Sequence, residues 1–165
     1  MNINEKLSDA IWEGTPIEAL PEGTDVHWFD EYGWNLLHVA AQYGRADVVR
    51  MLLDAGADAN AKTRQSEVEE GGNTALCIAC ETDLPGTAEI VQMLLEAGAD
   101  VNHENEDFHR RPIHYAAETG RPDVIKMLLD AGSKTHGMDL LRRTPRHLAV
   151  KSGNKEAAAL LQDAT

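Results

Sequence analysis

Two cysteines lie three positions apart in the segment Cys77-Ile-Ala-Cys80, a spacing that thiolate metal ligands and redox pairs use. A zinc site built on this pair would need a second pair to complete its four ligands, and the chain has no third cysteine. Both cysteines fall in an apolar stretch that we expect to be helical and buried. We therefore predict two structural thiols that behave as small hydrophobic side chains.

Histidines and acidic residues are the other groups that could support catalysis. His103 and His109 share one predicted loop, but a pair of loop histidines is weak evidence for a metal site. The sequence holds no Gly-x-Ser-x-Gly, no His-Glu-x-x-His and no Gly-Lys-Thr phosphate loop after Gly71-Gly72. We predict that the protein is not an enzyme and that it uses no metal and no cofactor.

Length and charge limit the classes of function. A chain of 165 residues is one domain by length, and 42% hydrophobic with 26% charged residues is typical of a folded protein. The formal net charge of −13 disfavours nucleic acid and anionic membranes, and it favours a protein partner with a basic patch. No apolar run approaches the ~20 residues that span a bilayer, and the N-terminus does not resemble a signal peptide. We expect a cytoplasmic protein, which agrees with its low cysteine content.

Self-similarity along the chain is the strongest signal. The segments 45–60 and 87–102 match at most positions, and 122–132 is a third copy. A shorter unit precedes each copy and occurs once more near the end; its copies are 35–41, 74–80, 111–117 and 144–150. From His114 to His147 the interval is 33 residues, and earlier intervals are longer. Insertions between Lys62 and Asn73 and at 83–85 account for most of the difference.

These units resemble the ankyrin repeat, in which Thr-Pro-Leu-His-x-Ala-Ala begins a first helix and Gly-Ala-Asp-x-Asn follows a second. The resemblance covers about Asp30 to the C-terminus. It implies an all-α solenoid of stacked helix pairs with projecting loops, with about four repeats plus a degenerate N-terminal cap repeat. We expect one domain over 1–165. Its units are a cap at 1–29, repeats at 30–62, 63–103 and 104–136, and a C-terminal cap repeat at 137–165.

Local chemistry supports these helices. Side chains that can accept a backbone N–H precede three of the first helices; they are Asn35, Thr74 and Thr144. The third repeat has Arg111 at this position, which cannot act as such a cap. Glycines that can adopt the left-handed conformation end the second helices at Gly56, Gly98 and Gly132. The resemblance also implies that His38, His114 and His147 tie loops to helices, and are structural.

Residues that depart from the repeat pattern are free to bind a partner, because stacking uses the inward-facing positions. In the first full repeat these residues are Phe29, Glu31, Tyr32, Trp34, Gln42 and Tyr43. Four of the six are aromatic in a chain with eight aromatic residues, and exposed aromatics are enriched in binding hot spots. The alternative is that Trp28, Phe29 and Trp34 pack against the degenerate first repeat.

The following repeats add further candidates. The third repeat offers Asp107, Phe108, Arg110 and Glu118 at equivalent positions. Acidic residues of the second repeat extend the surface; they are Glu69 and Glu70 in the long loop and Glu81. The alternative for the long loop is a solvated segment without function. Arginines near the C-terminus, such as Arg142 and Arg143, are explained by the solubility of the end repeat.

We therefore expect a non-enzymatic protein-binding module, an adaptor or inhibitor, that recognises its partner through a concave face and loop tips as a monomer. One alternative is a dedicated immunity-type inhibitor of a toxin or enzyme with a basic site. The other is a self-associating structural or assembly protein, in which exposed aromatics meet their own copies.

Overall fold

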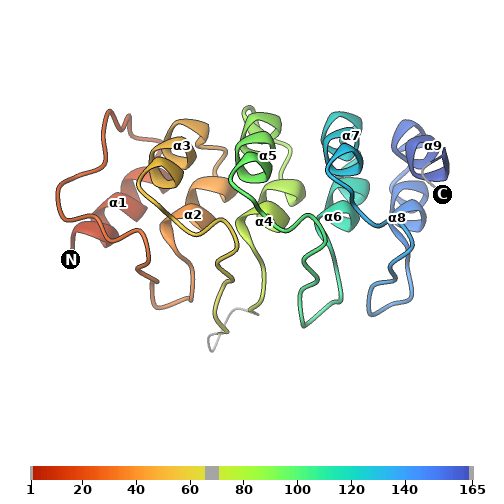
Figure 1. Cartoon of the computed structure of the whole chain (residues 1–165), viewed down its shortest axis with the longest axis horizontal. Helices are drawn as coiled ribbons and strands as arrows, with labels where there is room; N and C mark the ends of the chain where they lie inside the picture. Colours follow the sequence, from red (N-terminus) through yellow and green to blue (C-terminus); the bar gives the residue numbers. More distant parts are fainter. Residues whose placement is uncertain (1, 66–70, 164–165) are drawn as a thin grey trace.

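The computed structural model describes residues 2–65 and 71–163, and within these ranges its regular structure is helical apart from isolated bridges (Figure 1). The helices are α1 (Ile3–Trp12), α2 (Leu36–Gln42), α3 (Ala46–Asp54), α4 (Ala75–Glu81), α5 (Thr87–Glu96), α6 (Pro112–Thr119), α7 (Pro122–Asp130), α8 (Pro145–Lys151) and α9 (Lys155–Asp163). The predicted all-α class is confirmed.

The helices stack in two rows. The first row runs α1, α2, α4, α6, α8, and each of these helices packs on the next. The second row runs α3, α5, α7, α9, and each member also packs on its partner in the first row. The loops that precede α2, α6 and α8 project to the same side of the stack (Figure 1). This arrangement confirms the predicted solenoid of helix pairs with projecting loops.

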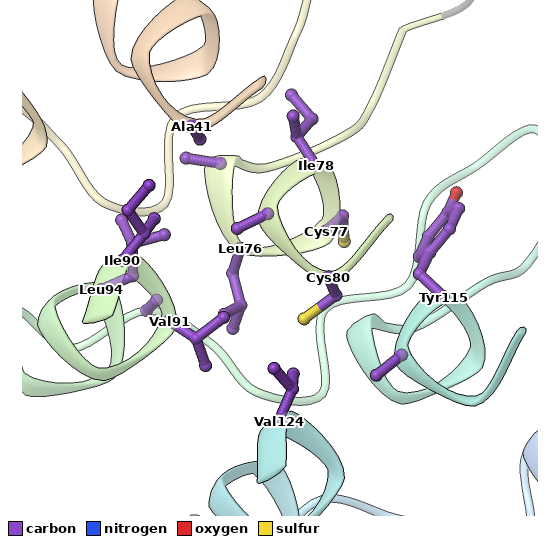
Figure 2. Packing of buried hydrophobic residues seen from close by; sticks show 14 of the residues in the cluster. Ala41, Leu76, Cys77, Ile78, Cys80, Ile90, Val91, Leu94, Tyr115 and Val124 are labelled. Atoms are coloured by element: carbon purple, nitrogen blue, oxygen red, sulfur yellow. The ribbon is translucent and has the colours of Figure 1, made fainter. Parts of the chain in front are cut away.

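The core lies between the two rows. Figure 2 shows Leu76 and Cys80 of α4 beside Ile90 and Leu94 of α5 and Val124 of α7, all buried. Side chains of this kind each stabilise the fold by about 1.5–3 kcal/mol when they leave water. Because neighbouring repeats share these contacts, no pair of helices forms its core alone.

The predicted helix caps are present. The side chains of Asn35, Thr74 and Thr144 accept the backbone N–H three residues later, at 2.9, 3.4 and 3.3 Å. Arg111 makes no such bond, yet α6 begins at Pro112. Proline at the first helical position has no N–H to satisfy and its φ is already helical. The N–H of Arg111 itself donates to Nδ1 of His114, at 3.1 Å.

The two ends of the stack differ. At the C-terminus, α9 forms the last helix of the second row and packs on α7 and α8. At the N-terminus, α1 has no second-row partner, because the apolar segment 17–20 is not helical. Ile17 and Leu20 pack against the core from an irregular chain. The N-terminal segment before α2 therefore contributes one helix and one irregular stretch that packs on the core.

Gly33 joins the loops of the first two full repeats. Its φ is 81°, and its carbonyl accepts the N–H of Arg64 at 2.8 Å. A Cβ at this position would collide with the backbone carbonyl of Arg64. Both the backbone conformation and the contact therefore require glycine.

We expect Gly33→Ala to lower the free energy of unfolding by about 3 kcal/mol, measured by urea denaturation, because strain and collision add. Gly56→Ala is the matched control. Gly56 also has a positive φ, 89°, but a Cβ there would meet no atom within 4 Å. The control should lose only about 1 kcal/mol. Equal losses in the two variants would show that the contact with Arg64 is unimportant.

Candidate functional site

A cavity of about 430 Å³ lies between α1, the first loop and α2. We call it the aromatic cavity. Its lining residues are Ser8, Asp9, Trp12, Asp30, Tyr32, Trp34, Val39, Gln42 and Tyr43. Four of the residues predicted to bind a partner, Tyr32, Trp34, Gln42 and Tyr43, are thus brought together in one hollow.

The aromatic side chains of this cavity are accessible to different degrees. Tyr32 is 51% exposed and Tyr43 is 42% exposed. Trp34 is partly buried, packs against the core and meets the His38 ring edge-on, with 6.1 Å between ring centroids. The tyrosines are therefore available to a partner, whereas Trp34 also supports the fold.

Trp12 is a member of the cavity that the sequence patterns did not single out. It is 62% exposed at the end of α1. Leu7 and Ile11, four residues apart, form the buried stripe of this helix. Trp12 lies outside that stripe, and this mismatch between residue type and position is the signal that could have identified it.

Asp30 shapes the loop that carries Tyr32 and Trp34. Its Oδ1 atom accepts the N–H of Tyr32 at 2.9 Å and the N–H of Trp34 at 2.8 Å. Such an aspartate turn fixes the backbone without using the second carboxylate oxygen. Asp9 and Glu31 are exposed, and in the described part of the chain they form no ion pair. The rim of the cavity is therefore acidic.

Phe29 and Glu31 lie beside the aromatic cavity but do not line it. The guanidinium carbon of Arg64 lies 3.7 Å from the centre of the Phe29 ring, and this ring is half-buried. Trp28 is also half-buried against the core. Phe29 thus contacts Arg64 and His38 rather than the first 29 residues, whereas Trp28 and Trp34 pack against the core. Glu31 is exposed and borders a second depression with Asp30.

The loops of the third and fourth repeats carry four exposed apolar side chains, which together we call the Phe108 patch. It consists of Phe108, Met138, Leu140 and Leu141. Leu140 is 57% and Leu141 67% exposed, and the N–H of Leu140 donates to the carbonyl of Phe108 at 2.8 Å. Phe108 was predicted as a binding residue. The repeat pattern did not identify the other three, because the last unit has the features of a cap. Leucines in a loop tip are the signal that could have identified them.

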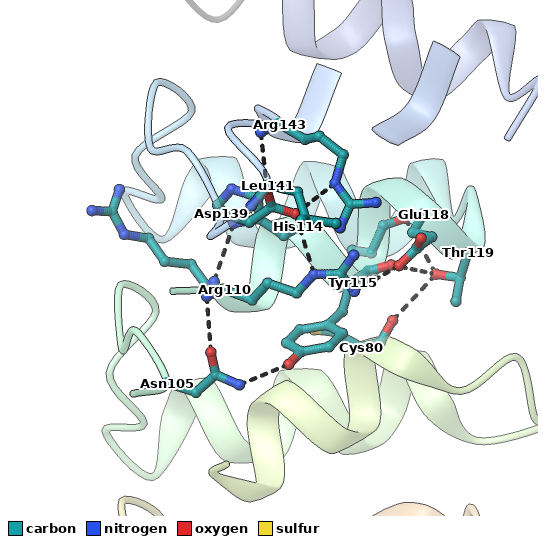
Figure 3. Close-up of polar contacts among 12 residues, drawn as sticks. Cys80, Asn105, Arg110, His114, Tyr115, Glu118, Thr119, Asp139, Leu141 and Arg143 are labelled. Carbon is teal, nitrogen blue, oxygen red and sulfur yellow. Dashed lines mark hydrogen bonds and ion pairs between the residues drawn. The ribbon is translucent and has the colours of Figure 1, made fainter. Parts of the chain in front are cut away.

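Asp139 holds this patch in place (Figure 3). Its side chain is 1% exposed and lies 2.7 Å from Nη2 of Arg143 and 3.6 Å from Nε of Arg110. Its Oδ1 atom also accepts the N–H groups of Leu141 and Arg143, at 3.0 and 2.9 Å. Burial by itself would raise the pKa of Asp139, but the hydrogen bonds and charge of Arg143, together with Arg110, outweigh it and hold that pKa below its usual range.

Arg110 and Glu118, both predicted to bind a partner, are paired with each other. Nη1 of Arg110 donates to Glu118 at 2.7 Å, and the Arg110 side chain is largely buried. Figure 3 shows this pair beside Asp139 and above Tyr115. Of the other acidic candidates, Glu81 is exposed and Asp107 is half-buried. Glu69 and Glu70 lie outside the described residues.

The two cysteines and the buried repeat histidines have structural roles. Burial raises the pKa of Cys77 to about 11 and that of Cys80 well above its usual value, so both remain protonated thiols, as predicted. His38 and His114 bond to the loop carbonyls of Ala61 and Gly137, at 2.9 and 3.1 Å, as the resemblance implied. His147 differs, because it is exposed and the structure gives its ring a bond only to Thr144 at the start of α8.

The structure also bears on metals and membranes. Across residues 2–65 and 71–163, no three histidine, cysteine or acidic side chains are grouped as a metal site would require. His103 bonds to the carbonyl of Gly72, and His109 to Glu104. In the same part of the chain no helix is both long and apolar enough to cross a membrane.

Comparison with known proteins gives the family. A family model for ankyrin repeats in three copies matches residues 7–105 and 86–165. The tyrosine-protein kinase HTK16 of Hydra vulgaris is 30% identical over 122 residues, which are 74% of this chain and 15% of that protein. The human neurogenic locus notch homolog protein 2 is 29% identical over 155 residues, or 94% of this chain and 6% of that protein. The chain thus spans a small part of these relatives. Both the matched repeats and the stacked helix pairs place the chain in the ankyrin-repeat family.

Proposed function

We propose that this protein is a non-enzymatic adaptor or inhibitor that binds a protein partner through its concave face and loop tips. Ankyrin repeats generally mediate protein–protein interaction. The observation that supports a site here is the aromatic cavity, in which Trp12, Tyr32 and Tyr43 are exposed around one hollow. Large aromatic side chains that remain in water gain free energy when a partner covers them.

The Phe108 patch extends the proposed surface. The loop of Tyr32 and the loops of Phe108 and Leu141 project to the same side of the stack (Figure 1). A partner lying along these loop tips would meet an apolar anchor near each end. Two separated anchors favour an elongated partner surface over a small molecule.

Charge supports a partner with a basic surface. The net charge is −13, and three of the acidic residues in this total, Asp9, Asp30 and Glu31, lie at the rim of the aromatic cavity. Complementary charge accelerates association and makes it sensitive to salt. The cytoplasmic location and the monomeric state belong to the same proposal.

We expect the double variant Trp12→Ala/Tyr43→Ala to keep its melting temperature within about 2 °C of the wild type, because both side chains are exposed. It should lose partner binding by at least about 30-fold, the effect of removing a hot spot worth ~2 kcal/mol. The measurement is capture by the immobilised chain from its native cells, followed by titration of the captured protein.

The matched control is Gln92→Ala on α5, an exposed residue of the second row. It should capture the same proteins as the wild type. Equal capture by the double variant and the control would refute the proposed surface. Sedimentation across concentration tests the alternative of self-association through the Phe108 patch; a dimer that Leu141→Ser dissociates would replace the adaptor proposal.

A further inference from the structure

We propose that the aromatic cavity is a receptor for an arginine side chain of the partner. This inference rests on the proposed function and assigns the chemistry of its main anchor point. Three observations support it: the exposed aromatic rings, the carboxylates without cationic partners and the size of the hollow.

Aromatic rings form much of the lining of the cavity. Trp12, Tyr32, Trp34 and Tyr43 line one cavity and come from α1, the first loop and the end of α2. The faces of tryptophan and tyrosine rings attract cations, and tryptophan does so most strongly. A guanidinium group also stacks on such faces as a flat, weakly hydrated ion. The protein uses this contact next to the cavity, where Arg64 lies over Phe29 at 3.7 Å.

The lining of the cavity is also acidic. Asp9 and Asp30 line the cavity, and none of its nine lining residues is basic. Within the described residues, Asp9 and Asp30 form no ion pair, and Asp30 uses only Oδ1 for its two backbone bonds. The remaining carboxylate oxygens of Asp9 and Asp30 accept no hydrogen bond from the described residues. The cavity therefore has negative charge that a cationic group of a partner could pair with.

Among cations, arginine fits this lining best. The free carboxylate oxygens need N–H donors, which a quaternary ammonium group lacks. Lysine offers donors, but its ammonium group is compact and strongly hydrated, and it does not stack. Arginine provides five donors in a flat group on a long apolar stem. A volume of about 430 Å³ accommodates this stem together with its guanidinium group.

The test is a titration with Nα-acetyl-arginine methylamide, followed by the indole N–H signals of Trp12 and Trp34 in NMR spectra. The citrulline analogue is the matched neutral probe, because it replaces the guanidinium group by a urea of the same shape. We expect saturable millimolar binding of the arginine probe, at least about tenfold tighter than that of the citrulline probe. The lysine and trimethyl-lysine analogues should bind more weakly than arginine.

Two outcomes would overturn the assignment. Equal binding of arginine and citrulline would show a site that does not recognise charge. Tighter binding of trimethyl-lysine would show a site for quaternary ammonium groups.

Variants test which groups are responsible. Trp12→Leu keeps an apolar side chain but removes the ring, and Asp9→Asn removes one charge from the lining. Each should weaken arginine binding about fivefold and leave citrulline binding unchanged. Glu13→Gln is the control, because Glu13 is adjacent to Trp12 in sequence, is exposed and does not line the cavity. An equal effect of Glu13→Gln and Asp9→Asn would mean that only net charge matters.

The two proposals can fail separately. If the arginine probe does not bind but Trp12→Ala/Tyr43→Ala abolishes protein capture, the arginine assignment is wrong and the protein-binding surface stands. If the double variant still captures the partner, the proposed function of this surface is wrong whichever probe binds.

Discussion

Replacing Asp139 by alanine is expected to lower the free energy of unfolding by about 3 kcal/mol, because it removes the buried partner of two arginines. The Asp139 side chain is 1% exposed and contacts Arg143 and Arg110. Without it, the N–H groups of Leu141 and Arg143 also lose their acceptor. Urea denaturation at neutral pH measures the loss. The Phe108 patch should lose its fixed shape as well, visible as faster amide hydrogen exchange at Leu141.

Asp139→Asn separates charge from hydrogen bonding. The amide oxygen can still accept both backbone N–H groups, so the loop should keep its shape, whereas the amide NH2 group cannot accept from Arg143 and the ion pairs are lost. We expect this variant to lose about half as much free energy of unfolding as the alanine variant. If both variants unfold at the same urea concentration as the wild type, the buried ion pairs make no net contribution to the free energy of unfolding. Asp139 would then not be what fixes the loop of the Phe108 patch.

The stack of helix pairs was predictable from the sequence because each repeat carries the same local signals for its helices. Apolar spacing, a capping side chain and a terminal glycine recur in the same order, so each prediction checks the others. Cys77 illustrates this: its place in the repeat, where other copies have histidine, correctly predicted a buried thiol. Even α6, which lacks a capping side chain at Arg111, begins where its proline indicates.

The site was predicted only in part, because it depends on contacts between units. Arg110 departs from the repeat pattern and was expected to face a partner. Its neighbours in the fold include Asp139, which comes from the next repeat, and no local pattern reveals that pair. Trp12 was missed for the same reason. Its role in a cavity depends on how α1 lies against α2 and the first loop, and the repeat pattern is degenerate in α1.

Acidification should destabilise the fold through its buried histidines. Burial lowers the pKa of His38 from 6.5 to about 4, against the opposing hydrogen bond to Ala61, and burial also lowers the pKa of His114. The folded chain thus binds these protons less tightly than the unfolded chain. The stability from His38 is fully present above about pH 6.5, and it is lost as the pH falls toward about 4.

We expect His38 to account for a loss of about 2 kcal/mol in the free energy of unfolding between about pH 7.5 and about pH 5, measured by urea denaturation. Carboxylates with ordinary pKa values are still mostly ionised in this window, so histidines dominate the change. His38→Cys is the informative variant, because the second repeat itself places Cys77 at this position. The variant is less stable at pH 7.5, since the bond to Ala61 is gone, but its stability should fall by about 2 kcal/mol less on acidification. If the free energy of unfolding falls equally in the variant and the wild type, His38 does not resist protonation in the folded chain. Its bond to the Ala61 carbonyl would then contribute less to stability than its burial suggests.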